Sequence, residues 1–424
     1  MPLSLLPKVF VGVKEIAGMM CGITHCLQQH GFETDLYLFD KHSFSYKHPV
    51  NSNPIFNNFL TIQEKLKTAR GKEKVALLIN EYQKSLELLF QDLLGKYDVF
   101  IFNGWRTIFP DYSDLPLLKR NGKRVIMFFL GSEGRPQWMQ GNSLELSLEG
   151  ILRQTQTVFN RVRFLEQHCD YVVSHPPTSQ FLTRPFVPFL GVGIPFLKPI
   201  GNVKPIRPES PLVLHAPSSP YKGTSRIRAA VETLKKEGQQ FEYLELKGVP
   251  NAVVLENLAR CSFVIDELYS DSLLAGLGTE AAHFGKPTLI GSLPDIRDTM
   301  QGSALPPPPC EIFHNGDPLP GMRRLLNDVE YTHTLGDQAR AYVNAHWSVE
   351  HIGQRLADMA RGEMFSGTLC QPENINYFRG WGLSDEEFHS MVTRYIKAFG
   401  HDALYISDKP QLLLSLLRWL KKNS

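Results

Sequence analysis

Cysteine is scarce in this sequence. The six cysteines form no CxxC pair and no spacing typical of zinc ligands, which argues against a cysteine zinc site and a disulfide framework. No apolar run approaches the roughly 18 residues of a membrane span, and the start MPLSLLPKVFVGV lacks the charged region and cleavage site of a signal peptide. We therefore expect reduced thiols in a cytoplasmic protein.

Net charge is also nearly absent. Forty-five basic and 43 acidic residues leave a formal charge of +2, which gives no electrostatic case for a nucleic-acid partner. The opening strand and helix lack GxGxxG, so we predict no dinucleotide site there. Hydrophobic content of 42% and charged content of 21% are globular values, and 424 residues suffice for two domains with separate cores.

The segment at 261–291, CSFVIDELYSDSLLAGLGTEAAHFGKPTLIG, has the order strand, loop, helix, strand. The expected elements are a strand at 263–265, a loop with Gly276 and Gly278, a helix at 279–284 and a strand at 288–290. This order is typical of a parallel α/β sheet.

The loop-to-helix junction of this segment suits a nucleotide. Gly276 and Gly278 let the backbone approach a ligand closely, and the helix N-terminus behind them, which starts at Thr279, favours a phosphate. Glu280, expected in the first turn, can accept hydrogen bonds from a ribose diol. The alternative is a plain crossover in which Glu280 only favours the helix N-terminus, because glycine pairs are weak signals.

The rest of the chain repeats the α/β pattern. We expect strands at 8–13, 34–39, 97–103, 124–130, 170–174, 212–215 and 241–246, helices at 19–29, 61–95 (one or two), 115–120, 146–168, 225–237, 250–259, 318–326, 331–346 and 347–361, a loop at 41–60 and a hinge at 190–210.

Two further segments carry site chemistry. Glu133 and Arg135 follow the strand at 124–130, and strand ends are where open α/β sheets place ligands; a local structural pair is the alternative. Lys222 precedes a helix in a loop of small residues, SSPYKGT, where cation and helix dipole together would stabilise a diphosphate. A solvated turn lysine is the alternative there.

Three motifs carry a family resemblance. GTEAAHFGKPTLIG, HAPSSPYKGT and LPLLKRNGKRVIMFFLGSEGR resemble segments of GT-B glycosyltransferases, especially the retaining family-four-like group, over roughly residues 8–361. The resemblance implies an α/β protein of GT-B architecture with two Rossmann-like domains facing a cleft. It implies an acceptor-side domain at 1–195, a nucleotide-sugar donor domain at 196–364 whose last helix crosses back, and a helical extension at 365–424.

The resemblance also implies site residues. Lys222 matches the residue that meets the donor pyrophosphate, and we predict that Lys222 and Glu133 are catalytic, with Arg135 beside Glu133 on the acceptor side. The predicted donor-binding residues are Gly18, Ser218, Ser219, Lys222, Gly223, Asp271, Ser272, Gly276, Gly278, Thr279 and Glu280. Ser272 stands where many relatives have a Glu, which Asp271 would replace, and Phe129 stands where they often have a His.

The implied activity is transfer of a sugar from a nucleotide-diphosphate sugar to a glycan, lipid-linked or small-molecule acceptor, with retention by family comparison alone and without a metal cofactor. A sugar-nucleotide epimerase of the same fold and a non-catalytic nucleotide-binding protein are the alternatives. In the extension, Ser384 and Glu387 predict a capping box before helices at 385–399 and 410–422. The last helix is amphipathic with a basic end, which suits either peripheral membrane contact or packing on the domain.

Overall fold

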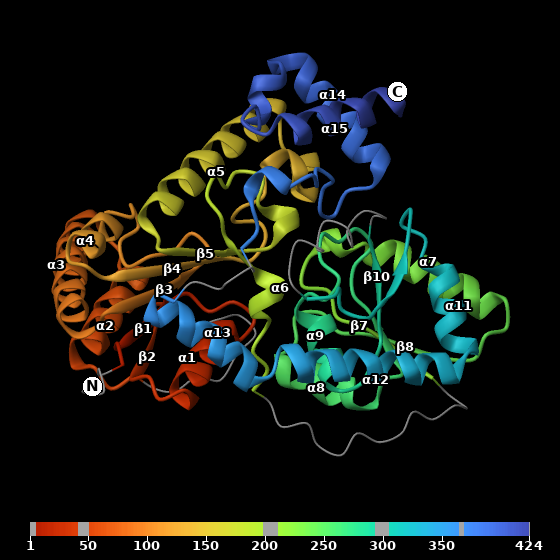
Figure 1. Cartoon of the computed structure of the whole chain (residues 1–424), viewed down its shortest axis with the longest axis horizontal. Helices are drawn as coiled ribbons and strands as arrows, with labels where there is room; N and C mark the ends of the chain where they lie inside the picture. The colour runs from red at the N-terminus through yellow and green to blue at the C-terminus, as the bar shows by residue number, and fades with distance from the viewer. Residues whose placement is uncertain (1–5, 41–50, 198–210, 293–304, 364–368, 424) are drawn as a thin grey trace.

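A computed structural model describes residues 6–40, 51–197, 211–292, 305–363 and 369–423. Figure 1 shows two α/β lobes side by side, with the last helices of the chain packed above the first lobe. Within these ranges all six cysteines are free thiols, and no helix is long and apolar enough to cross a bilayer.

The first lobe is built on six parallel strands in the order β2-β1-β3-β4-β5-β6. Their bounds are β1 Val9–Val13, β2 Thr34–Leu38, β3 Val99–Asn103, β4 Arg124–Phe129, β5 Tyr171–Ser174 and β6 Val187–Pro188. The strands β1 and β3 are buried along their whole length, as expected when helices cover both faces of a parallel sheet. The strand order reverses between β1 and β3, where such sheets place ligands.

Helices cover both faces of this sheet. They are α1 Met19–Gln29, α2 Pro54–Thr68, α3 Lys72–Lys96, α4 Asp114–Arg120 and α5 Leu148–His168, with 3₁₀ turns η1 Gln137–Met139, η2 Gly141–Glu145 and η3 Pro176–Thr178. The prediction of a loop through residue 60 is wrong at its end, because α2 begins at Pro54. Asn53 caps this helix by accepting hydrogen bonds from the amides of Ile55 and Phe56, and proline suits the first helical position. The predicted loop residues 41–50 lie outside the described ranges.

The second lobe repeats the design with five parallel strands in the order β11-β10-β9-β7-β8. Its elements are β7 Leu212–His215, η4 Pro220–Lys222, α7 Thr224–Lys236, β8 Glu242–Glu245, α8 Asn251–Arg260, β9 Phe263–Ile265, α9 Gly276–His283, β10 Thr288–Gly291, β11 Glu311–Phe313, α11 Leu319–Asn327 and α12 Val329–His346. The strands and helices predicted for this lobe are present, and β11 is an additional strand that was not predicted. The order reverses again between β7 and β9, so both lobes are doubly wound in the same way.

The chain crosses between the lobes twice within the described ranges. It leaves the first lobe after the short helix α6, Phe189–Val192, and returns where α12 gives way to α13, Val349–Arg361, which packs against α1. The indole of Trp347, between α12 and α13, donates to the carbonyl of Leu190 at 2.9 Å and lies so close to Gly193 that a Cβ there would overlap its ring. The two crossings are therefore in contact.

This arrangement confirms the predicted GT-B architecture, including the helix that crosses back. Residues 198–210 of the predicted hinge lie outside the described ranges. The described part of that hinge contains α6, which was not predicted. The exact domain borders at 195 and 364 stay predictions.

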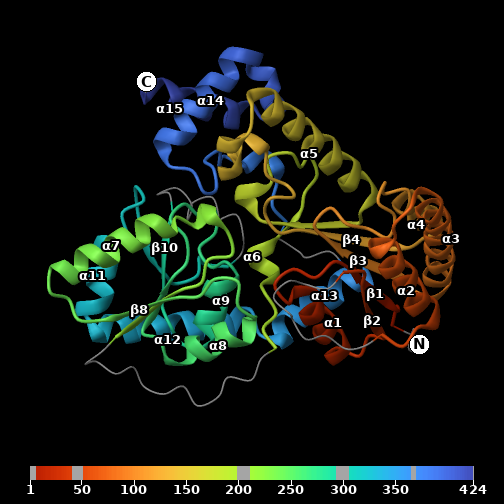
Figure 2. The same ribbon diagram turned by 180° about the vertical axis from the view of Figure 1, so that it is seen from behind.

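The extension contains η5 Pro372–Asn374, α14 Asp385–Phe399, η6 His401–Leu404 and α15 Pro410–Lys422. The predicted capping box is confirmed, because Ser384 and Glu387 exchange side-chain to backbone hydrogen bonds. The apolar face of α15 is buried through Leu412, Leu416 and Leu420, so that face is used in packing. Figure 2 shows α14 and α15 next to the end of α5.

Candidate functional site

The loops that follow the strands of the two lobes meet at the lobe boundary. The contact involves the loops after β1, β4 and β5 from the first lobe and the loop after β9 from the second lobe. A Cβ on Gly276 would lie 4.0 Å from that of Ala17, Arg135 pairs with Asp271, and His175 bonds the backbone of Asp271. Ligand sites of open α/β sheets lie outside the carboxyl ends of the strands, so this boundary is the candidate site.

A buried ion pair crosses the boundary between Arg135 and Asp271. Their side chains are 5% and 7% exposed, and a charge-assisted hydrogen bond joins a guanidinium nitrogen to a carboxylate oxygen. The alternative of a local Glu133–Arg135 pair is therefore wrong: Arg135 pairs with the other lobe. The carboxylate of Asp271, considered as a substitute sugar ligand, is already engaged.

His175 directly follows β5 and was missed by the sequence reasoning. Its Nε2 lies 2.6 Å from the carbonyl oxygen of Asp271. Because a carbonyl only accepts, Nε2 carries the proton and Nδ1 keeps a lone pair. Burial lowers the pKa of His175, which favours the neutral ring. Nδ1 is buried without a hydrogen-bond partner in the described part of the chain, so it is a basic nitrogen at the boundary.

A very small cavity lies beside this histidine. It measures about 10 Å³ and is lined by His175, Phe189, Leu190, Ser272, Leu273, Leu274, Pro308 and Trp347. A cavity of this size accommodates at most about one water molecule. Of the predicted donor-binding residues, it includes Ser272, whose backbone N–H donates to the Ser270 hydroxyl at 3.1 Å.

Lys222 lies at the end of the turn η4, after β7, and its side chain is buried. Its ammonium donates to the Asp266 carboxylate and lies 4.0 Å from an oxygen of Glu267. Burial alone would lower the pKa of Lys222, but the charges of Asp266 and Glu267 outweigh it and raise that pKa. The alternative of a solvated turn lysine is therefore wrong. Lys222 is a buried cation held between two acids.

The other predicted residues of this turn have different surroundings. Ser218 is exposed, and the Ser219 hydroxyl accepts the N–H of Tyr221 at 3.3 Å. Gly223 has a left-handed conformation with φ of 78°, and a Cβ there would overlap Leu268. The backbone conformation and the packing at this position therefore both require glycine. Of Ser218, Ser219 and Gly223, Ser218 is the exposed residue.

Glu267 connects the acids after β9 to the C-terminal extension. Its carboxylate accepts hydrogen bonds from the Ser270 hydroxyl and from the indole N–H of Trp381, both at 2.8 Å. Trp381 also lies near Arg135, 5.6 Å from guanidinium carbon to ring centroid, and near the ring of Tyr221. The sequence assigned no function to the extension, so this contact was missed.

The helix α9 starts earlier than predicted. It begins at Gly276, so both glycines lie in its first turn and Glu280 falls in the next one. The predicted glycine loop and first-turn Glu280 are therefore wrong. Gly278 serves packing, because a Cβ there would lie 3.3 Å from the hydroxyl of Thr288. The Glu280 carboxylate accepts a hydrogen bond from Asn251 at 2.9 Å.

The first lobe contributes the loop after β1. Gly18 caps α1 in a left-handed conformation with φ of 79°. The carboxylate of Glu15, another residue missed by the sequence reasoning, accepts the backbone N–H groups of Met20 and Cys21 at 3.2 and 3.1 Å. An internal carboxylate thus occupies the N-terminus of α1, which leaves that terminus poorly suited to a phosphate.

Glu133 is buried against Gly104, where a Cβ would lie 3.4 Å from its carboxylate. Burial raises the pKa of Glu133, opposed by its own backbone N–H and the charge of Arg135. A carboxyl group with a raised pKa is suited to proton transfer near neutral pH. Glu133 is therefore the acid/base candidate of the first lobe.

Several buried polar atoms near the boundary have no hydrogen-bond partner among the described residues. They are Asn103 Oδ1 and Nδ2, Arg135 Nε, His175 Nδ1, Asp266 Oδ2 and Thr279 Oγ1. Buried polar atoms are nearly always hydrogen-bonded, so such a group calls for a water or ligand. These atoms offer both donors and acceptors to a polar ligand.

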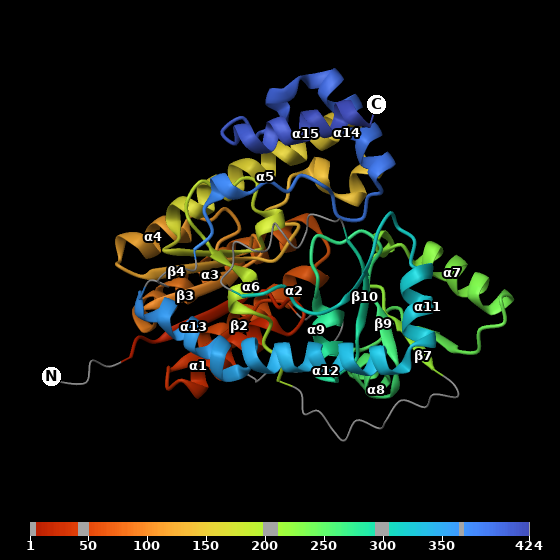
Figure 3. The same cartoon turned by 45° about the vertical axis from the view of Figure 1, so that its right-hand side comes forward.

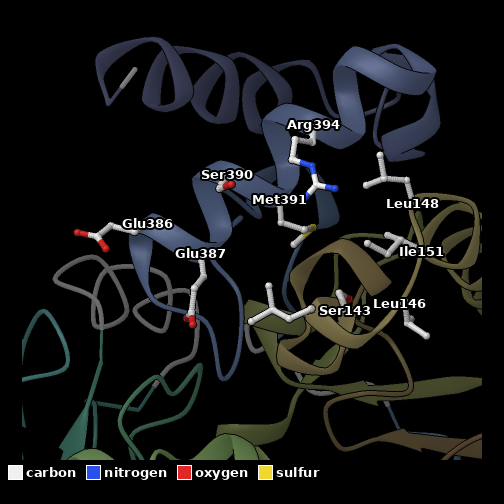
Figure 4. A pocket seen from close by; sticks show the side chains of 10 residues that line it. Ser143, Leu146, Leu148, Ile151, Glu386, Glu387, Ser390, Met391 and Arg394 are labelled. Atoms are coloured by element: carbon white, nitrogen blue, oxygen red, sulfur yellow. The ribbon is translucent and has the colours of Figure 1, made fainter.

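A larger cavity lies away from these residues. It measures about 330 Å³ between the η2–α5 segment and α14, and its walls include Leu146, Leu148, Ile151, Met391 and Arg394. Figure 4 shows Arg394 and Met391 reaching from α14 toward the leucines and Ile151. None of the predicted site residues lines it.

Solved structures share this fold. Sucrose-phosphate synthase from Thermosynechococcus elongatus is 13% identical, with a TM-score of 0.52 over 84% of this chain and 98% of that one. HepE from Anabaena, solved with UDP-glucose, is 13% identical, with a TM-score of 0.48 over 84% of this chain and 99% of that one. MurG from Acinetobacter baumannii is 11% identical, with a TM-score of 0.40 over 84% of this chain and 98% of that one. No protein-family model and no curated protein matches the chain. The first likeness shows that the chain has the GT-B fold.

Proposed function

We propose that the protein is a glycosyltransferase that moves a sugar from a nucleotide-diphosphate sugar to an acceptor at the lobe boundary. The observation that carries the proposal is the meeting of Arg135 and His175 with Asp271. Segments predicted separately for acceptor and donor thus lie side by side. The unpartnered polar atoms beside them and the GT-B fold shared with a sucrose-phosphate synthase support it.

The donor would bind the second lobe. The backbone N–H groups in the first turn of α9 suit the diphosphate, and Glu280, one turn further, suits the ribose. As the bond between sugar and phosphate breaks, negative charge grows on the diphosphate, and stabilising it is the main electrostatic task. Lys222, held by Asp266 and Glu267, would supply the positive charge that stabilises the leaving diphosphate, and the proposal requires no metal ion.

The acceptor would bind the first lobe, as a glycan, a lipid-linked molecule or a small molecule. Glu133 and His175 follow adjacent parallel strands, β4 and β5, and bring one raised carboxyl pKa and one basic nitrogen to the boundary. Such groups could move the acceptor proton. Retention of the anomeric configuration is part of the proposal and is supported by the family resemblance alone.

A thermal-shift screen tests the proposal. UDP, dTDP, GDP and ADP, and their glucose conjugates, are added to the full chain, and we expect at least one to raise the melting temperature, because a ligand bound only by the native state stabilises it. The conjugate that binds is then offered with a panel of sugar, lipid and small-molecule acceptors, and transfer is followed by release of the nucleotide diphosphate. Absence of binding by all eight compounds would contradict the proposal.

A non-catalytic nucleotide-binding protein is the second candidate. It is favoured by one observation: both predicted site cations, Lys222 and Arg135, already pair with carboxylates. Tight binding of a nucleotide sugar without transfer across the acceptor panel would support it. Turnover of the donor sugar without any acceptor would instead support an epimerase, for which Glu133 and His175 supply the required acid/base groups.

Glu280→Ala should weaken nucleotide diphosphate binding. Loss of a charge-assisted hydrogen bond to the ribose costs about 1.5–3 kcal/mol, which is roughly a 10- to 100-fold loss of affinity by calorimetry. Asn251→Ala is the control, because it removes a partner of Glu280 and keeps the carboxylate. Equal affinity of Glu280→Ala and wild type would rule out the ribose role.

Glu133→Gln should lower turnover more than donor affinity, because Glu133 lies on the acceptor side. It should also change the pH dependence of stability. The pKa of Glu133 in the native state is raised above its ordinary value of 4.5, so the native state binds the proton more tightly than the unfolded chain does. The resulting contribution to stability is lost as the pH rises from 4.5 through the raised pKa. The melting temperature of Glu133→Gln relative to wild type should therefore increase from pH 4.5 upward. A constant difference would show that Glu133 titrates normally.

A further inference from the structure

The segment between η5 and α14 joins the extension to both lobes. The N–H of Trp381 donates to the carbonyl of Met139, and the N–H of Gly141 donates to the carbonyl of Trp381, both at 2.8 Å. The N–H of Gly382 donates to the carbonyl of Tyr269 in the second lobe at 2.9 Å. In Figure 3 this part of the chain descends from α14 and α15 toward the top of the second lobe.

The rest of the extension is fixed to the first lobe. The indole of Trp138 donates to the carbonyl of Leu404 at 3.2 Å, and Gln180 donates to that of Tyr377 at 2.8 Å. Buried Lys409 donates to the carbonyl of Leu182 at 2.6 Å. The extension therefore enlarges the first lobe, and residues 381–382 carry it across the boundary.

The turn at Gly382 is tightly specified. Its φ of 71° is left-handed, and a Cβ there would lie 2.9 Å from the Cβ of Tyr221. Gly141 is equally close to this turn, since its own Cβ would lie 2.8 Å from the carbonyl oxygen of Gly382. These contacts fix the position of the neighbouring Trp381 backbone, so its indole is held against Glu267 and Arg135.

We propose that Trp381 is a positioning residue of the boundary site, through which the extension holds Glu267 and Arg135 in place. The ligand part of this inference rests on the proposed function. Trp381 donates to the carboxylate beside Lys222 and lies near the guanidinium paired with Asp271. It thus contacts one member of each ion pair.

The hydrogen bond from Trp381 should lower the pKa of Glu267. A hydrogen bond to the charged form of a carboxyl group favours that form. Glu267 also faces Lys222, Asp266, Asp271 and the Ser270 hydroxyl, and burial raises its pKa against the charge of Lys222. Removing the indole N–H raises that pKa further. Protonated Glu267 no longer competes with an anionic diphosphate for Lys222, so nucleotide affinity should increase as the pH falls. In a variant without the indole N–H, this increase should begin at a higher pH than in wild type.

Three variants of the full chain test the proposal. Trp381→Phe keeps an aromatic ring and removes the N–H, Trp381→Ala removes both, and Trp419→Phe makes the same conservative change within the extension, where Trp419 packs on Phe378 and Phe388. Amide hydrogen exchange of the ligand-free proteins is measured over residues 131–141 and 266–272. We expect roughly 10-fold faster exchange there in Trp381→Ala, less in Trp381→Phe, and wild-type rates in Trp419→Phe.

Affinity for the most stabilising of UDP, dTDP, GDP and ADP is then measured across pH. The midpoint of its pH dependence should move up by about one unit in Trp381→Phe and stay in place in Trp419→Phe; titration of the ligand is common to all proteins. Wild-type exchange in Trp381→Ala, or an unmoved midpoint in Trp381→Phe, would overturn the proposal. If wild type binds none of these four diphosphates, exchange alone decides the positioning role; the proposed function itself fails only if none of the eight compounds of the thermal-shift screen binds.

Discussion

We expect Lys222→Ala to lower both stability and turnover. Removing the ammonium leaves Asp266, which is 0% exposed, and Glu267 without their cation. Breaking a buried ion pair from one side costs about 3–5 kcal/mol, or roughly 3–6 °C in the melting temperature of a chain of this length that unfolds in one transition. Loss of one preorganised electrostatic contact to the leaving diphosphate should lower the turnover rate of the folded enzyme by ~100-fold or more.

A double variant separates these two effects. Lys222→Ala with Asp266→Asn removes the buried charge that was hydrogen-bonded to Lys222, while Glu267 keeps its hydrogen bonds from Ser270 and Trp381. We therefore expect most of the lost melting temperature to return while turnover stays low. Lys236→Ala, at the exposed far end of the helix α7 that follows η4, controls for loss of a lysine from the same lobe. Wild-type turnover of Lys222→Ala at saturating substrates would show that the donor-loop assignment is wrong. An unchanged melting temperature would contradict the buried pair.

The second large effect is expected at the pair between the lobes. Asp271→Ala and Arg135→Ala should each cost about 3–5 kcal/mol, because each leaves the other charge buried. Since Arg135 and Asp271 belong to different lobes, loss of the ion pair should also separate the unfolding of the two lobes into two calorimetric transitions. The double variant should lose about 1–3 kcal/mol less than the sum of the single changes, because contacting residues couple.

Arg323→Ala is the matched control for this experiment. Arg323 pairs with Glu237 in an exposed contact confined to the second lobe, with both side chains 42% exposed. Such surface pairs contribute little to stability, so scanning calorimetry should give a wild-type melting temperature and one transition. Strict additivity of Arg135→Ala and Asp271→Ala, or one unshifted transition in either, would contradict the role of the buried pair.

Most strands and helices could be predicted from the sequence because they depend on local patterns, whereas the two-lobed GT-B arrangement was expected from the family resemblance. Apolar strands alternating with amphipathic helices predicted both parallel sheets, and the capping box at Ser384 was predicted from four residues. The start of α9 was missed because glycine was taken as a loop signal. In the structure Gly278 allows α9 to approach Thr288, which is a packing requirement between segments that local preference does not contain.

The site was harder to predict because its partners are distant in the chain. The position of Glu133 and Arg135 at a strand end and that of Lys222 before a helix followed from the sequence, and Asp271 was singled out by the family resemblance. Their partners did not follow from the sequence: Arg135 and Asp271 are 136 positions apart, and Lys222 and Asp266 are 44 apart. Local sequence patterns do not say which charge a side chain meets: packing within the second lobe decides it for Lys222, and packing between the lobes decides it for Arg135. Their predicted roles in catalysis and binding stay predictions.

The two contacting chain crossings at Trp347 and Leu190 restrict how the lobes can move. Two connections joined at one place oppose separation of the lobes at that place, but they allow the lobes to rotate about it. In Figure 1 the return from α12 to α13 lies at the bottom of the boundary, whereas the extension lies at the top. Trp381 bonds the first lobe through its backbone and Glu267 of the second lobe through its indole, so it joins the lobes at a second place. Two separate links oppose a rotation that either link alone would allow.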